Sequence, residues 1–349
     1  MKKIISFSIL LMSVSFMALV FYCFFTDTPI KKKLPFLSSL ISDNLDYTEE
    51  HKQMDYNAVD EDYMSNNGTL TNTQGTSKTN IIYRDNTPKV YQPAKSGIFQ
   101  YNSPDGTFHI DASNSEEGYI IVSYTGDNPK PKMMLTGQEL NTYTYTIIPN
   151  ADLVIPLTSG ACTYQLSFFE NIEGDKYKQN YTLEMPFNVK NQWTAFLYPN
   201  YYVEFNQNSQ CVHIAQELAQ KCVTDIDVIK NVYYYVIKNI SYDYEMAANL
   251  KTDYIANPDK TIYTKKGVCI DYACLMASML RSQGIPTKVE VGYCDNVYHA
   301  WVSIFSADEG WINGIFRFDG SSWSLIDPSI VNDKDERLFD KIYYTKYVY

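Results

Sequence analysis

The segment at residues 267–286, GVCIDYACLMASMLRSQGIP, constrains the fold more than any other part of the chain. Gly267 supplies a turn before it, and Gly284 followed by Pro286 closes it in the order typical of a helix C-terminus. Apolar residues between them recur at helical spacing and cover a broad surface. The segment therefore predicts a helix over residues 269–283 that packs against another layer.

Strands are predicted after this helix and further helices before it. Two helices are expected at residues 209–222 and 225–244, the second from apolar residues three and four apart. A helix packed on an antiparallel meander predicts the α+β class for a domain at residues 205–349. The four segments expected to form that meander are residues 287–294, 299–305, 314–318 and 322–328.

The two cysteines of this helix are separated by their positions. Cys269 falls at the helix N-terminus, where unpaired N–H groups and the helix dipole stabilise a thiolate. Cys274 falls in the middle of the helix, where a cysteine among Ala, Leu and Met is usually a small buried hydrophobe. Position therefore makes Cys269 the candidate nucleophile and Cys274 a packing residue.

A thiolate nucleophile needs a base that exchanges a proton near neutral pH, and histidine suits that role. The chain has 4 histidines, and His299 begins a predicted strand that could face the helix start. The other three histidines lie in a polar segment, a predicted strand and a predicted helix, and none of them is a candidate base. Asp327 ends the predicted strand beside that of His299 and is the leading candidate to orient the imidazole. Asp319 is the second candidate, although the Gly-Ser-Ser after it suggests a hairpin turn.

The order of these motifs resembles the transglutaminase-like superfamily. The resemblance rests on KKGVCIDYACLMASMLRSQGIPTKVEVGY, then YHAW, then WSLIDPS, and it covers about residues 210–335. It implies a papain-like core with Cys269 as nucleophile, His299 as base and Asp327 as orienting acid. It also implies a bacterial surface protein with an Ig-like module upstream.

The resemblance further implies acyl transfer on peptide amides through a thioester on Cys269. Water would complete hydrolysis, as in a cysteine peptidase or amidase, or an amine would complete cross-linking by a thiol acyltransferase. The backbone N–H of Cys269 would hold part of the oxyanion, with Tyr263 as a candidate second donor. Trp301 or Tyr298 would form a wall of the substrate groove. Because the superfamily also has members without demonstrated activity, a non-catalytic surface binding module is the alternative.

A zinc site is a further alternative that the spacing does not favour. Cys269, Cys274, Cys294 and His299 form a C-x4-C-x19-C-x4-H arrangement. Residues five apart on a helix diverge, and zinc ligands usually have a shorter spacing. We therefore expect neither a metal nor a cofactor.

The first 30 residues have the composition of a targeting element. Lys2 and Lys3 precede an apolar run at residues 4–25 that is long enough to cross a bilayer. The bulky residues at its end do not fit a cleavage site. The sequence thus predicts a signal anchor in residues 1–30, a single-pass cell-membrane protein and extracytoplasmic C-terminal domains. Cleavage of a signal peptide would instead give a secreted protein.

Two more regions separate this element from the predicted α+β domain. Residues 31–95 are acidic and then rich in Asn, Thr and Ser, without a sustained period, which predicts a disordered tether. Residues 96–192 contain short strand-like segments separated by turn residues, which predict an Ig-like β-sandwich.

The charge of the chain limits its partners. The formal net charge is −11, and no basic stripe with interleaved aromatic residues is present. Nucleic-acid binding requires clustered Lys and Arg, so a nucleic-acid partner is excluded. We expect a protein or peptide substrate, which an extracytoplasmic location extends to cell-wall peptide.

Overall fold

The computed structural model describes residues 81–138, 141–251, 253–294, 296–306, 310–313, 316–318, 323–325 and 343–349. The anchor predicted in residues 1–30 and the tether up to residue 80 lie outside the described residues. Among the described residues, no helix is both long and apolar enough to cross a membrane.

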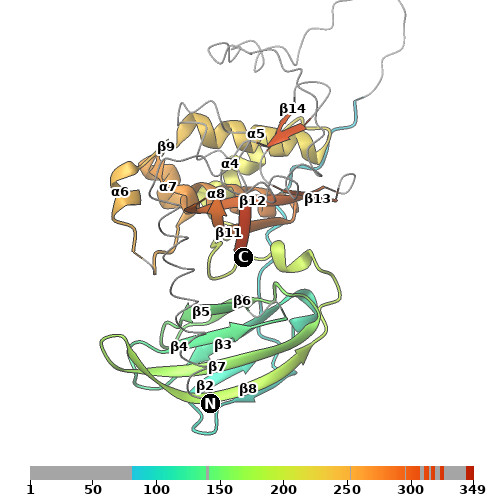
Figure 1. Cartoon of the computed structure of the whole chain (residues 1–349). Coiled ribbons are helices and arrows are strands. Elements are labelled where there is room, and N and C mark those ends of the chain that lie inside the picture. Colours follow the sequence, from blue (N-terminus) through green and yellow to red (C-terminus); the bar gives the residue numbers. More distant parts are fainter. Residues whose placement is uncertain are drawn as a thin grey trace, which may run out of the picture. The chain divides into compact units, whose positions relative to one another are not determined.

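Two four-stranded antiparallel sheets occupy residues 100–187 (Figure 1). Phe108 of one sheet lies against Phe168 of the other, with ring centroids 4.9 Å apart. In the first part of the strand of Phe168, Tyr164, Leu166 and Phe168 are buried and the residues between them are more exposed, as in a strand with one buried face. The Ig-like topology itself stays a prediction. One sheet has the order β1 (Gln100–Asn102), β2 (Phe108–Asp111), β3 (Tyr119–Tyr124), β6 (Leu153–Pro156), and the other β5 (Thr142–Thr146), β4 (Lys132–Thr136), β7 (Cys162–Glu173), β8 (Lys176–Phe187).

Helices follow in the second part of the chain. In α5, Asp227 accepts the Thr224 N–H and the Thr224 hydroxyl donates to the same carboxylate, which fixes the first turn. Both predicted upstream helices are present but end earlier than expected. The helix predicted at residues 269–283 is confirmed as α8, and Gly284 after it adopts φ +74°. The helices are α4 (Gln210–Leu218), α5 (Asp225–Asn239), α6 (Tyr244–Ala248), α7 (Pro258–Thr264) and α8 (Cys269–Ser282), with short 3-10 turns η3 (Ser115–Glu117) and η4 (Thr194–Phe196).

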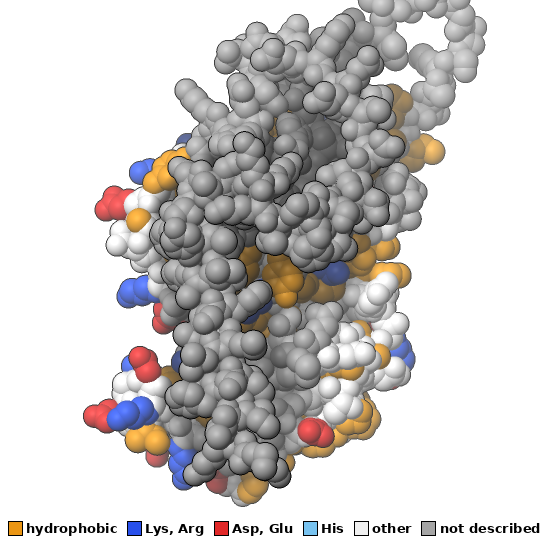
Figure 2. All heavy atoms as spheres, viewed as in Figure 1, with side chains coloured by type: hydrophobic (Ala, Val, Ile, Leu, Met, Phe, Trp, Pro, Cys, Tyr) orange, Lys and Arg blue, Asp and Glu red, His pale blue; other side chains and the backbone are white. Residues whose placement is uncertain are grey.

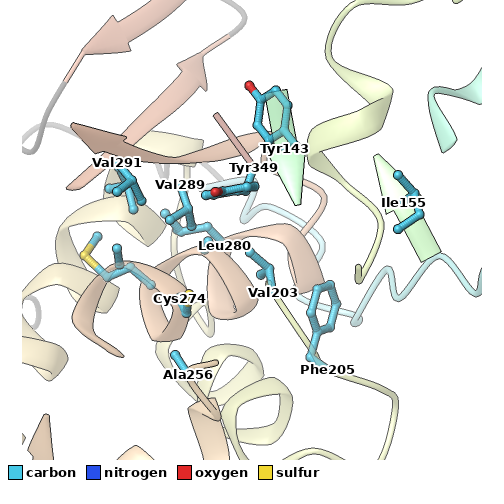
Figure 3. Packing of buried hydrophobic residues seen from close by; sticks show 14 of the residues in the cluster. Tyr143, Ile155, Val203, Phe205, Ala256, Cys274, Leu280, Val289, Val291 and Tyr349 are labelled. Atoms are coloured by element: carbon cyan, nitrogen blue, oxygen red, sulfur yellow. The ribbon is translucent and has the colours of Figure 1, made fainter. Parts of the chain in front are cut away.

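A four-stranded antiparallel sheet packs on α8. Its order is β13 (Gly310–Asn313), β12 (Val297–Ser306), β11 (Thr287–Cys294), β16 (Tyr343–Val348). Val289 and Val291 of β11 lie between this sheet and α8, beside Leu280 and Cys274 (Figure 3). The mixed helix-and-sheet arrangement agrees with the expected α+β class.

The composition of this sheet corrects one expectation. Within the described residues, the segments predicted at 314–318 and 322–328 do not extend it: β14 (Phe316–Phe318) and β15 (Trp323–Leu325) pair with each other and with no third strand. The edge beside β11 is taken instead by β16, which the sequence analysis did not predict. A second two-stranded sheet, β9 (Ser241–Tyr242) with the parallel β10 (Lys266–Gly267), precedes α8.

Residues 81–95 differ from the disordered tether that the sequence analysis extends to residue 95. The Arg84 N–H donates to the Cys222 carbonyl at 2.7 Å, and the Lys89 N–H donates to the Ser282 carbonyl at 2.6 Å. The Arg84 guanidinium also pairs with Asp225. We call residues 81–95 the strap, because their contacts reach residues at or near the ends of α4, α5 and α8.

Tyrosines connect β5 to Tyr202 and to the C-terminal residues Val348 and Tyr349. The Tyr143 hydroxyl accepts the Val348 N–H at 3.2 Å, and the Tyr202 hydroxyl donates to the Thr144 carbonyl at 3.2 Å. Tyr143 and Tyr349 meet edge to face with ring centroids 5.6 Å apart (Figure 3). Part of the large tyrosine content, 31 residues, is thus used in packing.

Candidate functional site

Cys269 is the first residue of α8 and is half-buried. The N–H of Val268, the residue before it, donates to Asp271 Oδ2 at 2.8 Å, so the Asp271 carboxylate caps the first turn of the helix. Gly267 permits this close packing, because a Cβ at that position would lie 2.6 Å from the Asp271 Cβ. The Gly-x-Cys spacing therefore sets the geometry of the turn that carries the thiol.

Asp271 is buried with only 2% of its surface exposed. Its Oδ1 accepts the Tyr254 hydroxyl at 2.7 Å. Burial raises the pKa of the Asp271 carboxyl, and the hydrogen bonds from Tyr254 and Val268 oppose the shift. The helix of the candidate nucleophile thus begins beside a fixed, desolvated carboxyl group.

Cys274 lies inside the core, which confirms its interpretation as a packing residue. Its thiol donates to the Tyr202 carbonyl at 3.1 Å. Burial raises the pKa of this thiol far above its ordinary value, so it is protonated at neutral pH. The two cysteines of α8 therefore occupy unlike environments, as their positions in the sequence predict.

His299 is the third residue of β12 and lies opposite Gly292 of β11. Its ring is buried and stacks near the Trp301 ring, with centroids 6.3 Å apart and planes 21° apart. Tyr343 of β16 meets the edge of Trp301 at 5.0 Å and lies 6.5 Å from His299. The imidazole is therefore enclosed by two aromatic rings on one face of the sheet.

The alternation of side chains along β12 places His299 and the residues next to it on opposite faces of the sheet. Ala300 and Val302 pair with Val291 and Val289, which face α8 (Figure 3). Because successive side chains of a strand point to opposite faces, His299 lies on the other face, near the end of the sheet. The contact between the Cys269 thiol and the His299 ring stays a prediction.

Tyr298 of β12 lies within electrostatic range of Cys269. Burial raises the pKa of the Tyr298 phenol, and the nearby phenols of Tyr347 and Tyr293 and the Cys269 thiol raise it further. Tyr298 is nevertheless 55% exposed, and its ring meets Tyr293 of β11 edge to face at 5.5 Å. An accessible phenol thus lies close enough to the candidate nucleophile for their charges to interact.

The remaining predicted site residues fall in three different settings. Tyr263 is 88% exposed on α7, and its role as an oxyanion donor stays a prediction. Trp301 is 4% exposed, so it packs against His299 rather than lining an open surface. Asp327 and Asp319 lie outside the described residues. Within the described parts of the chain, no cluster of three or more His, Cys, Asp or Glu side chains could hold a metal ion.

A protein-family model matches the part of the chain that carries α8, β11 and β12. Residues 212–314, from α4 to just past β13, match the sequence model of the Transglutaminase-like superfamily. These residues form a transglutaminase-like domain. The matched segment contains Cys269 and His299 and ends before Asp327.

One curated protein resembles part of the chain. UPF0252 protein MJ1282 of Methanocaldococcus jannaschii is 33% identical over 88 residues, which are 22% of this chain and 25% of that protein. The chain thus spans about a quarter of the length of this curated relative.

Two solved structures also resemble the chain. One is provisionally described as a cysteine protease from Cytophaga hutchinsonii, with 14% identity, a TM-score of 0.31 and coverage of 69% of this chain and 79% of that one. The other is provisionally described as a protease from Parabacteroides distasonis, with 13% identity, a TM-score of 0.27 and coverage of 60% and 64%. Scores this low carry no argument about the fold or function of this chain.

Asp271 and Tyr254 are the site residues that the sequence analysis missed. An acidic residue at the third position of a helix is a known capping signal. Here Val268 occupies the N-cap position, where Ser or Thr would complete the usual pattern. The sequence therefore contains only half of the capping pattern. No sequence pattern links Tyr254 to Asp271, because only the fold brings the two side chains together.

Proposed function

We propose that the protein is a cysteine enzyme that transfers acyl groups from peptide amides, with Cys269 as nucleophile. One observation carries the proposal: the transglutaminase-like domain holds a half-buried cysteine at the first residue of its central helix. Free N–H groups and the helix dipole at that position stabilise a thiolate.

His299 takes the role of base in this proposal, and Asp327 that of the acid that orients it. The thiolate attacks the amide carbonyl, His299 protonates the departing amine, and a thioester remains on Cys269. Water or an amine then releases the acyl group, which gives hydrolysis or cross-linking. Support for His299 comes from its position within the matched segment and its enclosed, buried ring.

We further propose that the protein acts outside the cytoplasm on protein or cell-wall peptide, held to the membrane by residues 4–25. The acidic net charge of −11 supports a neutral or basic peptide partner rather than nucleic acid. On the face shown in Figure 2, Lys and Arg side chains are interspersed with acidic ones.

The decisive experiment incubates the full chain with casein and a fluorescent amine, beside Cys269→Ala as the matched control. Incorporation of the amine by the wild type alone supports a transferase, and cleavage of casein by the wild type alone supports a peptidase. Equal results for the two proteins would reject catalysis by Cys269.

A non-catalytic binding module is the second candidate, and one observation favours it. Strand alternation assigns Tyr298 to the face of β12 that packs on α8 and His299 to the opposite face. Chemical modification discriminates the two functions: a His299→Gln variant that labels with a thiol reagent at the wild-type rate would favour the binding module. A large loss of rate would favour the enzyme.

A further inference from the structure

The first turn of α8 holds an acidic group that the proposed mechanism does not use. Asp271 is buried, and each of its oxygens is engaged: Oδ2 by the Val268 N–H at 2.8 Å and Oδ1 by the Tyr254 hydroxyl at 2.7 Å. The carboxyl group cannot rotate without losing a hydrogen bond in a desolvated place, which is costly. Asp271 therefore fixes the backbone immediately before the nucleophile.

This arrangement divides the amides at the start of the helix into two groups. The first N–H groups of an α-helix have no acceptor within the helix. Here the Val268 N–H is taken by the carboxylate, and the Asp271 N–H donates to the Val268 carbonyl at 2.9 Å. Among the described residues, no acceptor is found for the amides of Cys269 and Ile270. The free donors are therefore the two amides nearest the thiol.

We propose that Asp271 is a positioning residue that holds the Cys269 and Ile270 amides toward the carbonyl oxygen of the substrate. This inference rests on the proposed function, since it concerns the oxyanion of that reaction. When the thiolate attacks, a carbon–sulfur bond forms and the carbonyl π pair moves onto oxygen. When that oxyanion collapses, the π bond reforms and the leaving group departs with its bonding pair, which leaves a thioester. Amides fixed in advance at that oxygen lower the barrier.

The packing around Asp271 supports a fixed rather than an incidental contact. A side chain on Gly267 would push against the Asp271 Cβ, at 2.6 Å, so the chain comes as close to the carboxyl group as glycine allows. Tyr254 comes from the connection between α6 and α7, 17 residues before Asp271, and is half-buried. Three separate segments thus converge on one side chain below the thiol.

Two reagents distinguish this role from simple helix stabilisation. p-Nitrophenyl acetate acylates a thiolate through a tetrahedral oxyanion, with p-nitrophenolate as the leaving group. Iodoacetamide alkylates the same thiolate by displacing iodide from a saturated carbon, so no oxyanion forms. The rate of each modification at Cys269 is measured on the full chain by peptide mass spectrometry.

We expect Asp271→Ala to slow acetylation of Cys269 by about 10²-fold, while alkylation changes by less than about threefold. Tyr254→Phe removes one of the two bonds to the carboxyl group and should slow acetylation by about tenfold. Asp271→Asn should retain acetylation within about fivefold, because its amide can accept the Val268 N–H and donate to the Tyr254 oxygen. Rescue by this conservative variant separates hydrogen-bond geometry from charge.

Asp227→Ala is the matched control, because Asp227 occupies the same third position in the capping box of α5. Its loss should leave both rates at Cys269 unchanged. The inference is overturned if acetylation and alkylation fall together in Asp271→Ala, or if neither Asp271→Ala nor Tyr254→Phe slows acetylation. If Asp271→Ala does not fold, the inference is tested by whether Tyr254→Phe slows acetylation more than Asp271→Asn does. A wild type that alkylates but does not acetylate would instead remove the proposed function, and this inference with it.

Discussion

Burial separates the chemistry of the two thiols of α8 at the scale of single residues. The Cys274 thiol donates to a backbone carbonyl inside the core, and desolvation raises its pKa. Cys269 is half-buried at the helix start, where the positive end of the dipole favours an anion. Since the thiolate is the reactive form of cysteine, these surroundings predict a difference in rate.

Iodoacetamide at neutral pH should label Cys269 at least about 10²-fold faster than Cys274, because a buried thiol with a raised pKa is protonated and enclosed. Cys294, which is also buried, is the internal comparison. Mass spectrometry of the digested chain measures all three sites at once, and labelling in urea confirms that each peptide is detected. Equal native rates at Cys269 and Cys274 would contradict the assignment of the nucleophile.

The raised pKa of Asp271 predicts a dependence of stability on pH. A carboxyl group whose pKa is higher in the folded than in the unfolded protein binds its proton more tightly when folded. Its favourable contribution is complete below the unfolded pKa, about 4, and is lost as the pH rises through the folded pKa. Relative to Asp271→Asn, the wild type should therefore lose free energy of unfolding as the pH rises above about 4. Urea unfolding of both proteins across this range measures it, and parallel pH profiles would refute it.

At the scale of elements, Gly292 decides how β16 joins the sheet. The register of β11 with β16 shifts between Val291 and Gly292. A Cβ on Gly292 would lie 2.0 Å from the Tyr344 carbonyl oxygen, so the two backbones approach more closely there than any side chain permits. The same pairing of β11 with β16 determines the position of Tyr343, which packs on Trp301 beside His299.

Gly292→Ala should lower the free energy of unfolding by about 2–4 kcal/mol, because β16 must move away from β11. Gly174→Ala is the matched control: it has φ +52° but open space for a Cβ, and it should cost about 1 kcal/mol. Urea unfolding compares the two variants. A smaller loss for Gly292→Ala than for Gly174→Ala would show that the close approach is not required.

At the scale of the whole molecule, the strap joins segments that are distant in sequence. Its backbone bonds reach Cys222 after α4 and Ser282 at the end of α8, and Arg84 pairs with Asp225 at the start of α5. Further along, the Ala94 N–H donates to the Tyr119 hydroxyl of β3 at 3.3 Å. The strap thus contacts both the transglutaminase-like domain and the strands before it.

Arg84→Ala should lower the free energy of unfolding by about 1–2 kcal/mol, because Arg84 is largely buried and its charge is hydrogen-bonded. Lys176→Ala is the control, since Lys176 and Glu173 form an exposed pair at 3.7 Å that should contribute less than about 0.5 kcal/mol. Thermal and urea unfolding of the full chain measure both. Equal effects would show that the strap does not stabilise the fold.

The sequence predicted α8 almost to the residue because glycine and proline mark its ends locally. It missed β16, because pairing with β11 joins residues about fifty positions apart, and no local pattern specifies such a register. The strap was assigned to the tether for a similar reason: its polar residues bond to distant carbonyls that composition cannot reveal. Of the candidate site, the positions of Cys269 and Cys274 followed from helix geometry, whereas Tyr254 reached Asp271 only through the fold.

The stacking of His299 on Trp301 gives this site an optical consequence. A protonated imidazole accepts an electron from an excited indole and quenches its fluorescence, whereas the neutral ring does so weakly. Because the two ring centroids are 6.3 Å apart, the emission of Trp301 should fall as His299 takes up a proton. The chain has 4 tryptophans, so the difference between the wild type and Trp301→Phe isolates this signal. The protonation of the candidate base could then be followed by light alone, without a substrate.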